Sequence, residues 1–479
     1  MEFIQASPGY DLTYSDVFLV PRHSDVGSRL SVSLAPDDSS GATIPLVSAN
    51  MNSVTGPRLA ATLARRGALG VLPQDLHLQD LDAAIRWVKA QPVAFDTPLS
   101  LRPEQTVADA LRQIPPIEGH GIVLSDEHGH FLGCLSAAEL AKASLDTRLS
   151  DLLHGRLTAI DAGDVTDARA AFELMVAADL EFAPVLHHGS LVGTLSRTSA
   201  LRSTLYAPAL DKNGRLRVAA AVGINGDVAA KATALVSAGV DLLVIDTAHG
   251  HQESMVRAIK TVAALGLGVP IVAGNVVTAE GVTDLVEAGA HIVKVGVGPG
   301  AMCTTRMMTA VGRPQFSAVL EAAEAARSLG AHVWADGGVR YPRDVALALA
   351  AGASSVMIGS WFAGTIEAPG ELERDAAGGL YKQSWGMAST KAVHERFERL
   401  SAFDLARKEL FAEGISSSKI YLDPLRPSVE DLLDMITSGV RSSLSYAGSK
   451  NLREFRERAL VGIQSAAGYD EGKALPASW

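Results

Sequence analysis

Short apolar segments alternate with longer helix-like segments along most of this chain. Eight of the apolar segments have the length of buried strands, and a loop rich in Gly, Asn, Asp or Ser follows each one. They are Pro45–Met51, Ala68–Leu72, Val218–Gly223, Leu242–Ala248, Ile271–Val276, Ile292–Val297, His332–Gly338 and Ser355–Gly359. The pattern predicts an α/β protein in which eight βα units close into a parallel (β/α)8 TIM barrel, with its site at the carboxyl ends of the strands. A doubly wound open sheet is the alternative.

The interval from Gln91 to Tyr206 breaks this pattern and contains two related halves. Leu132–Ser136 in the first half resembles Val192–Ser196 in the second, so a repeat of roughly 60 residues interrupts the barrel after its second strand. We predict that residues 1–90 begin the barrel and 91–206 form the insert. Residues 207–479 then complete the barrel, with a catalytic flap at about 378–426 and a C-terminal segment.

The repeat resembles a tandem cystathionine-β-synthase-type (CBS) module, which commonly binds adenine nucleotides. Such modules often place a carboxylate for a ribose near the second helix of each half. Glu139 occupies that place in the first half, but Ser199 occupies it in the second. The resemblance implies a regulatory site for ATP or GTP, and a purely structural insert is the alternative.

Composition narrows the classes of function. The chain has 479 residues, 47% of them hydrophobic, a formal net charge of −11 and two cysteines. The acidic balance argues against binding nucleic acid or an anionic membrane, and no apolar run could span a bilayer. The start of the chain lacks the basic and apolar stretches of a secretory signal, and two distant cysteines exclude a disulfide scaffold. We therefore predict a cytoplasmic protein.

One cysteine lies in a glycine-rich loop directly behind a predicted strand. The segment Gly296–Arg306 reads Gly-Val-Gly-Pro-Gly-Ala-Met-Cys-Thr-Thr-Arg. Its glycines let the backbone approach a ligand closely, and a thiol followed by two hydroxyls and an arginine suits nucleophilic attack on a bound electrophile. A buried, inert cysteine in a tight turn is the alternative.

Motifs near the start of the chain and on successive predicted strands carry a resemblance that covers nearly the whole chain. They are Leu12–Pro21, Ile44–Met51, Gly296–Arg306, Ala335–Val339 and Ile358–Ser360. In this order they resemble the IMP dehydrogenase/GMP reductase family. The resemblance implies an oxidoreductase that moves a hydride between C2 of a purine nucleotide and a nicotinamide, in a homotetramer or octamer.

The catalytic residues follow from this resemblance. Cys303 is implied to add to the purine C2 and form a covalent adduct. Thr305 is similar to the hydroxyl that works with a flap glutamate in proton transfer, and Glu413 is the candidate glutamate. The alternatives are a loop cap for Thr305 and a solvated charge for Glu413.

The binding residues are implied in the same way. Those on the substrate side are Asp336 for the ribose, Gly337, Gly338, Gly359 and Ser360 for the phosphate, and Gly386, Met387 and Asn50. Those on the nicotinamide side are Asp246, Asn275, Gly296, Val297 and Gly298. The backbone of Gly298, Gly300 and Cys303 corresponds to a site for a monovalent cation such as K⁺. Ala301 and Ser384 depart from the family pattern, which leaves open the source of two phosphate contacts.

The flap bears on the direction of the reaction. A dehydrogenase hydrolyses its adduct and needs a base to activate water, which in the family is usually an Arg-Tyr pair. Here Arg396 is followed by Phe397, which has no hydroxyl to deprotonate. The missing hydroxyl favours reductive deamination of GMP to IMP and ammonia with NADPH, or with NADH as the alternative. The CBS-type insert is instead typical of a dehydrogenase.

Three other functions remain as alternatives. The first is oxidation of IMP to xanthosine monophosphate with NAD, which lies within the same family. The second is a catalytically silent nucleotide sensor, and the third is an unrelated phosphate-binding barrel that uses no nicotinamide. Turnover with any purine nucleotide would exclude the sensor, and a change in nicotinamide absorbance would exclude the unrelated barrel.

We predict that replacing residues 91–206 by a short linker leaves an active barrel, because the insert supplies none of the eight predicted strands. Steady-state turnover of the truncated chain is the measurement, with circular dichroism as the control for folding. A folded but inactive product would show that the insert helps to build the site. Retained turnover with an altered response to ATP or GTP would identify the insert as regulatory.

Overall fold

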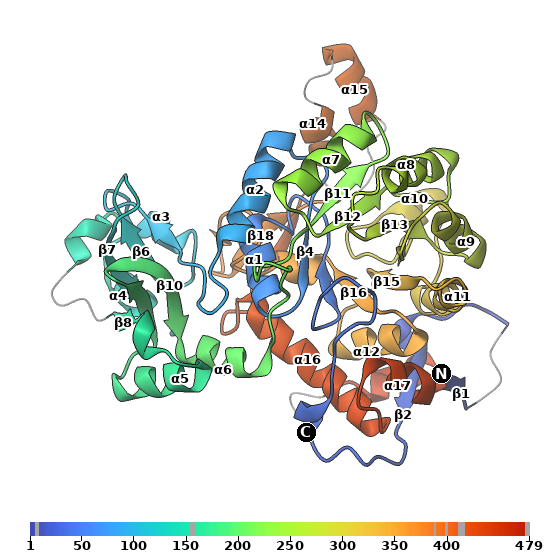
Figure 1. The fold of residues 1–479 in the computed structure, drawn as a ribbon, viewed down its shortest axis with the longest axis horizontal. Coiled ribbons are helices and arrows are strands. Elements are labelled where there is room, and N and C mark those ends of the chain that lie inside the picture. The colour runs from blue at the N-terminus through green and yellow to red at the C-terminus, as the bar shows by residue number, and fades with distance from the viewer. Residues whose placement is uncertain (5–8, 154–158, 388, 398–400, 411–416, 475–479) are drawn as a thin grey trace.

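The structure is a computed structural model that describes residues 1–4, 9–153, 159–387, 389–397, 401–410 and 417–474. Eight parallel strands form a closed barrel in the order β11-β12-β13-β14-β15-β16-β3-β4 (Figure 1). Their bounds are β3 Leu46–Ser48, β4 Leu69–Leu72, β11 Ala219–Gly223, β12 Leu242–Asp246, β13 Ile271–Val276, β14 Ile292–Val295, β15 His332–Asp336 and β16 Ser355–Ile358. The predicted TIM barrel is confirmed, and the open sheet is excluded.

Several strands end earlier than the apolar pattern predicts. β14 stops at Val295 and β15 at Asp336, whereas the prediction ran on to Val297 and Gly338. Gly337 and Gly338 have φ values of 85° and 83°, which take the chain out of the strand conformation. The residues just beyond each strand are therefore free to form loops at the end of the barrel.

Helices form the outer layer of the barrel (Figure 1). They are α1 Pro57–Arg65, α2 Leu78–Ala90, α7 Val228–Ala238, α8 Glu253–Ala264, α9 Ala279–Glu287, α11 Gln315–Ser328, α12 Pro342–Ala351 and α16 Val429–Tyr446. Their apolar faces and the outward faces of the strands share one large core. No helix within the described ranges is long and apolar enough to cross a membrane.

Apolar side chains from all eight strands fill the barrel interior, among them Val47, Val71, Ala221, Val244, Val272, Ile292, Trp334 and Met357. A buried polar group closes the amino end. Asp38 accepts hydrogen bonds from Trp334 Nε1 at 2.8 Å and from Ser354 Oγ at 2.9 Å, and Ser354 directly precedes β16. The interior is thus a packed core, and a ligand can enter only from the carboxyl end.

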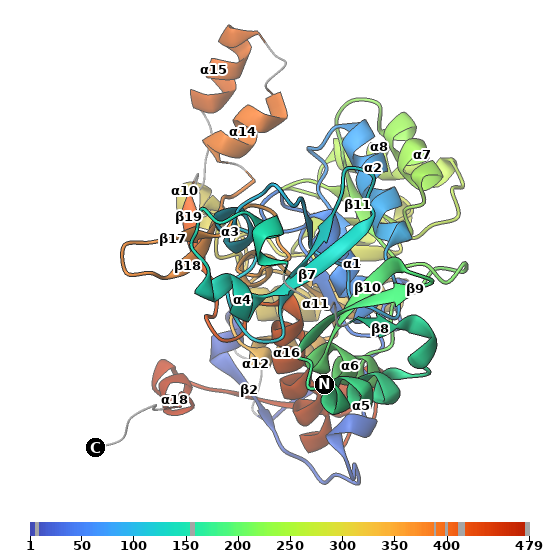
Figure 2. The same ribbon diagram turned by 90° about the vertical axis from the view of Figure 1, so that its left-hand side faces the viewer.

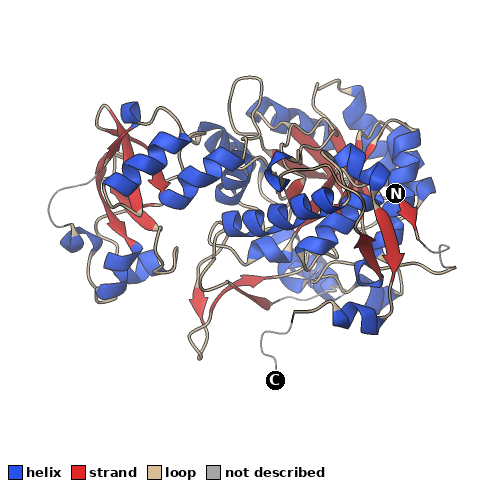
Figure 3. Ribbon diagram, turned by 90° about the horizontal axis from the view of Figure 1, so that it is seen from below, coloured by secondary structure: helices blue, strands red, loops and turns tan. Residues whose placement is uncertain are grey.

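Residues 100–142 and 160–205 repeat one element order, a strand, a helix, two strands and a helix. The first half contains β5 Ser100–Leu101, α3 Val107–Leu111, β6 Gly121–Ser125, β7 Phe131–Ser136 and α4 Ala137–Lys142. The second contains β8 Ile160–Asp161, α5 Ala168–Ala177, β9 Phe182–His187, β10 Ser190–Ser196 and α6 Arg197–Leu205. Each half has its own small core, and together they form a lobe beside the barrel (Figure 3).

Buried ion pairs join this lobe to the barrel. Arg202 on α6 contacts Glu430, Asp431 and Asp434 on α16, with the shortest distance 2.5 Å between Arg202 Nη2 and Asp431 Oδ1. Arg66, at the end of α1, contacts Glu430 as well. Ion pairs between arginines and acidic residues of α16 therefore hold the lobe against the barrel where the chain returns to it.

The predicted flap region begins in a three-stranded sheet, formed by β17 Glu373–Arg374, β18 Leu380–Ser384 and β19 Ser418–Tyr421. Between β18 and β19 the chain forms α14 Thr390–Phe397 and α15 Ala402–Leu410, which extend away from the barrel (Figure 2). His394 Nδ1 and Glu409 Oε1, 2.7 Å apart, join the two helices.

Candidate active site

The interior of the barrel changes from apolar to charged at the carboxyl ends of its strands. Side chains two positions apart on a strand point to the same face. Three such pairs mark the change: Val244 and Asp246 on β12, Ile292 and Lys294 on β14, and Trp334 and Asp336 on β15. The charged member of each pair lies above the apolar core, and together the three charged side chains form the bottom of the candidate site.

Lys294 is the centre of these polar groups and is almost completely buried, at 2% exposure. Its Nζ lies 2.8 Å from Asp246 Oδ1, 2.9 Å from Asp336 Oδ2 and 2.6 Å from Asn275 Oδ1. Burial alone would disfavour the charged amine, but the two carboxylates outweigh it and raise the pKa of Lys294 above its ordinary value. The lysine is therefore a cation at every physiological pH.

Two asparagines complete this cluster. Asn275 Nδ2 donates to Asp336 Oδ2 at 2.9 Å and to the carbonyl oxygen of Gly296 at 2.7 Å. Asn50, two residues beyond β3, donates from Nδ2 to Asp246 Oδ2 at 3.0 Å. We call Asn50, Asp246, Asn275, Lys294 and Asp336 the polar cluster. The structure thus brings together four residues that the sequence placed on two sides of the site, and adds Lys294.

The cysteine loop rises from the end of β14, next to the polar cluster. Cys303 is exposed, and its thiol donates to Thr305 Oγ1 at 3.2 Å. Thr305 is the first residue of the short helix α10 (Thr305–Thr309), and the N–H of Cys303 donates to the Gly300 carbonyl at 3.0 Å. An exposed thiol beside a hydroxyl fits a nucleophile and does not fit the alternative of a buried, inert cysteine.

The turn after β15 packs against the cysteine loop. A Cβ on Gly337 would lie 3.3 Å from Gly300 Cα, and one on Gly338 would lie 3.2 Å from Pro299 Cβ. Only glycine allows this approach at positive φ, so the turn and the loop together present backbone groups. Gln315 reinforces the contact, since its Nε2 donates to the carbonyls of Val295 at 2.8 Å and Asp336 at 3.1 Å.

The end of β16 and the flap strand approach the same opening from the β3 side. Gly359 lies close to the segment after β3, since a Cβ there would be 3.6 Å from Met51 Sδ, and Ser360 begins the short helix α13 (Ser360–Ala363). Ser384, at the end of β18, forms a 2.9 Å hydroxyl contact with Ser53. Gly386 and Met387 follow two and three residues after Ser384, so this segment starts from the β3 edge of the site.

The flap residues cannot be placed against these groups. Glu413 lies outside the described residues, so its predicted role stays a prediction. Arg396 and Phe397 end helix α14, and the structure describes their backbone but not their side chains.

Sequence reasoning missed Lys294 and Gln315. Lys294 interrupts an otherwise apolar strand, and its spacing of two from Ile292 places it on the interior face. This spacing was the signal in the sequence that could have identified Lys294 as an interior residue. Nothing local in the sequence distinguishes Gln315, because its partners are carbonyls at the ends of two other strands. Within the described ranges, no group of three or more His, Cys, Asp or Glu side chains could hold a metal ion.

TIM-barrel enzymes carry their active sites at the carboxyl end of the barrel. The exposed thiol, the polar cluster and the glycine turns all lie at this end. The molecule therefore belongs to the class of (β/α)8-barrel enzymes.

Similarity to known proteins specifies the family. The IMP dehydrogenase / GMP reductase domain matches residues 11–474, and the chain belongs to this family. It is an oxidoreductase that acts on purine nucleotides with a nicotinamide cofactor. The predicted family is confirmed, and the unrelated barrel is excluded.

Individual relatives differ in their named reaction. A protein named GMP reductase from Mycobacterium tuberculosis is 55% identical over 481 residues, covering 100% of both chains. An inosine-5'-monophosphate dehydrogenase from Staphylococcus saprophyticus is 37% identical over 469 residues, covering 96% of this chain and 94% of its own. A crystal structure of a cysteine-to-alanine variant of Trypanosoma brucei GMP reductase with guanosine 5'-monophosphate has a TM-score of 0.69 at 30% identity, covering 99% of both chains.

We predict that Cys303→Ala lowers turnover by about 10³-fold or more, the scale expected when a covalent nucleophile is lost. Folding and nucleotide binding should persist, because the thiol is exposed and its loss opens no cavity. Turnover and equilibrium binding of GMP are the measurements. Cys134→Ala, which changes the other cysteine in β7 of the insert, is the matched control and should keep normal turnover. Near-normal turnover of Cys303→Ala would rule out the covalent mechanism.

Proposed function

We propose that this protein is a GMP reductase, which converts GMP, NADPH and a proton into IMP, NADP⁺ and ammonia. The observation that carries this choice is the 55% identity over the full chain to a protein of that name, against 37% to a dehydrogenase. Phe397 at the end of α14 supports it, because a phenyl ring cannot act as the base that hydrolysis requires.

In this mechanism the Sγ of Cys303 bonds to C2 of the guanine ring, and the C2–N bond to the amino group breaks. The thiol proton leaves toward Thr305 Oγ1, 3.2 Å away, and the amino group gains one proton as it departs as ammonia. We assign that proton delivery to Thr305 together with Glu413. NADPH, when bound, supplies the hydride that becomes the C2–H of IMP. Cys303 then leaves C2 as the thiolate.

The polar cluster suits the two ligands on its two sides. Asp336 would accept hydrogen bonds from the ribose hydroxyls, and the backbone of Gly337, Gly338, Gly359 and Ser360 would hold the phosphate. Gly386 and Met387 would border the purine, with Asn50 on the β3 side. Asp246, Asn275 and the 296–298 segment would face the nicotinamide. This fit is supported by the hydrogen bond that Asn275 Nδ2 donates to the Gly296 carbonyl at 2.7 Å, which joins two of these groups.

Two further properties belong to the proposal. Backbone carbonyls in the 298–303 turn would hold a monovalent cation such as K⁺, since carbonyl oxygens suit such ions. We also propose a homotetramer or octamer in the cytoplasm. Met307, Met308 and Val311, beside the cysteine loop, are 89%, 63% and 57% exposed, and a subunit contact would cover them.

The reaction direction is tested by two parallel assays. With GMP and NADPH we expect cofactor oxidation and ammonia release. With IMP and NAD we expect little or no xanthosine monophosphate, because Phe397 cannot assist water activation. Absorbance of the nicotinamide and an ammonia assay are the measurements, with NADH run beside NADPH. Robust IMP oxidation without GMP reduction would instead assign the protein as an IMP dehydrogenase in which Arg396 activates water alone. No turnover in either direction would favour a nucleotide sensor.

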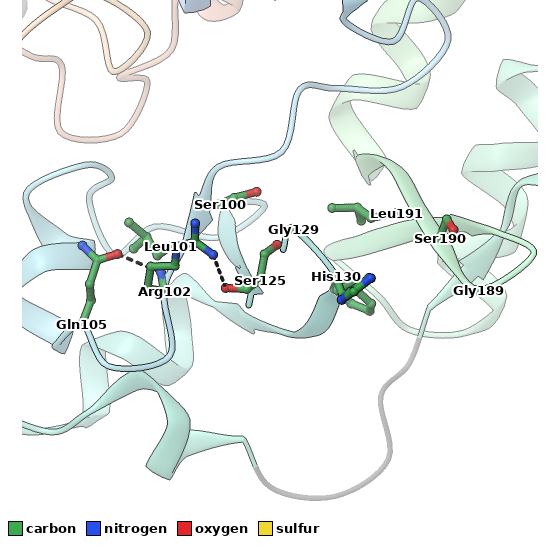
Figure 4. A pocket seen from close by; sticks show the side chains of 11 residues that line it. Ser100, Leu101, Arg102, Gln105, Ser125, Gly129, His130, Gly189, Ser190 and Leu191 are labelled. Atoms are coloured by element: carbon green, nitrogen blue, oxygen red, sulfur yellow. Dashed lines mark hydrogen bonds between the residues drawn. The ribbon is translucent and has the colours of Figure 1, made fainter. Parts of the chain in front are cut away.

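We propose the insert as the regulatory site for ATP or GTP. A cleft of about 660 Å³ opens between its two halves (Figure 4). Arg102, Gln105 and Ser125 lie on one side of it and Ser190 and Leu191 on the other, an arrangement in which a guanidinium could meet a phosphate. The carboxylate expected at Glu139 is not among the lining residues. It accepts from the N–H and hydroxyl of Ser136 in the cap of α4, and Ser199 caps α6 in the same way.

We predict that Arg102→Ala weakens the binding of ATP or GTP about tenfold, the equivalent of one lost charge-assisted hydrogen bond. Calorimetry on the full-length protein measures this. Arg112→Ala removes another exposed arginine, from the end of α3, and should leave nucleotide affinity unchanged. Wild-type protein that binds neither nucleotide would favour the alternative of a purely structural insert.

A further inference from the structure

Lys294 links the two ligand sides of the barrel opening. Its ammonium group lies between Asp336, on the proposed ribose side, and Asp246, on the proposed nicotinamide side. The two carboxylates remain partly accessible, at 20% and 22% side-chain exposure, whereas the lysine side chain is 2% exposed. Lys294 itself is therefore too deep to be reached easily by a ligand, and it acts on the site through its partners.

The hydrogen bonds around Lys294 occupy three of the four carboxylate oxygens. Asp246 uses Oδ1 for Lys294 and Oδ2 for Asn50. Asp336 uses Oδ2 for both Lys294 and Asn275. Among the described residues, Oδ1 of Asp336 has no hydrogen-bond partner. The arrangement thus holds one acceptor oxygen in a fixed orientation and leaves it open toward the site.

Electrostatics make this orientation depend on the cation. Two carboxylates that share a site repel each other, and the cation between them offsets this repulsion and holds both in place. The charged groups that act on Lys294 are Asp246 from β12 and Asp336 from β15, and Asn275 from β13 adds only a neutral amide. An Asp336 carboxylate that turned out of this orientation would no longer align with ribose hydroxyls.

We propose that Lys294 is a positioning residue for GMP binding, which fixes the Asp336 carboxylate and directs its open oxygen to the ribose. This inference rests on the proposed function. If Lys294 only stabilised the fold, its loss would lower stability without a specific effect on GMP affinity. The inference instead requires that GMP affinity depend on the charge of Lys294 at this end of the barrel.

The opposite end of the barrel supplies a matched control. Lys89 lies between Asp211 and Asp241, at 3.0 and 2.6 Å, and its side chain is 4% exposed. Asp241 directly precedes β12, whereas Asp246 ends the same strand. Lys89 and Lys294 therefore have the same kind of buried environment, but only Lys294 adjoins the candidate active site.

The experiment compares GMP affinity of Lys294→Met, Lys89→Met and wild-type protein by calorimetry from pH 6.5 to 8.5. Dividing each variant's dissociation constant by the wild-type value at the same pH cancels the titration of the GMP phosphate. For Lys294→Met we expect a ratio of about ten or more at pH 7, the equivalent of one lost charge-assisted hydrogen bond to the ribose. For Lys89→Met we expect a ratio near one at every pH, with a comparable loss of melting temperature.

A double variant tests the charge argument directly. Lys294→Met with Asp246→Asn removes the repulsion as well as the cation, so GMP affinity should return to within about threefold of wild type at pH 7. This variant also decides the question if Lys294→Met alone does not fold. A Lys294→Met ratio near one, or a ratio that the double variant does not restore, would overturn the inference. Failure of both variants to fold would count against it, because Lys294 would then be a requirement of folding. Wild-type protein that neither binds nor reduces GMP would refute the proposed function itself, which is a separate outcome.

Discussion

Closure of the parallel barrel is the constraint on which the rest of the structure depends. β4 and β11 must pair, although residues 91–206 lie between them in the chain. The insert therefore has to leave and return at one edge, which makes it a separate lobe. Closure also gathers the carboxyl ends of all eight strands around one opening. Residues as distant in sequence as Asn50 and Asp246 then come within hydrogen-bond distance.

Charge is buried at the points where this architecture is joined. β12 has a lysine between two aspartates at each end, and the junction to the insert places Arg66 and Arg202 against acidic residues of α16. Removal of one partner of such a buried pair typically costs about 3–5 kcal/mol, because the remaining charge stays desolvated. Each of these groups therefore depends on its partners being kept. Buried charges also connect α16 to the flap region. Glu367 accepts a hydrogen bond from the start of α16 and interacts electrostatically with Arg58 and with Lys382, which lies on β18.

The sequence predicts the barrel well because its strands are apolar on both faces and its turns contain glycine. Gly239, Gly289 and Gly352, just past the ends of α7, α9 and α12, all have positive φ. The contact between Cys303 and Thr305 was predictable as well, since both residues lie in one short loop. Lys294 was not, because its function depends on carboxylates from two other strands. Glu139 shows the opposite error, since a local helix cap accounts for a carboxylate that the repeat pattern placed at a ribose. The boundaries of the insert and the role of Glu413 remain predictions.

The two reactions of this family share the same covalent chemistry at C2, so the barrel alone cannot determine direction. Cys303, Thr305 and the polar cluster serve addition to the purine equally well whether the amino group or a hydride leaves C2. The difference arises afterwards, when the adduct meets either water or a hydride donor. Water needs a base, and the resemblance to the family places that base on the flap. In this chain, helices α14 and α15 extend from the small sheet beside the barrel and carry Phe397 and, beyond α15, Glu413. The proposed direction of the reaction therefore depends on this separate segment, where Phe397 lacks the hydroxyl that hydrolysis would use.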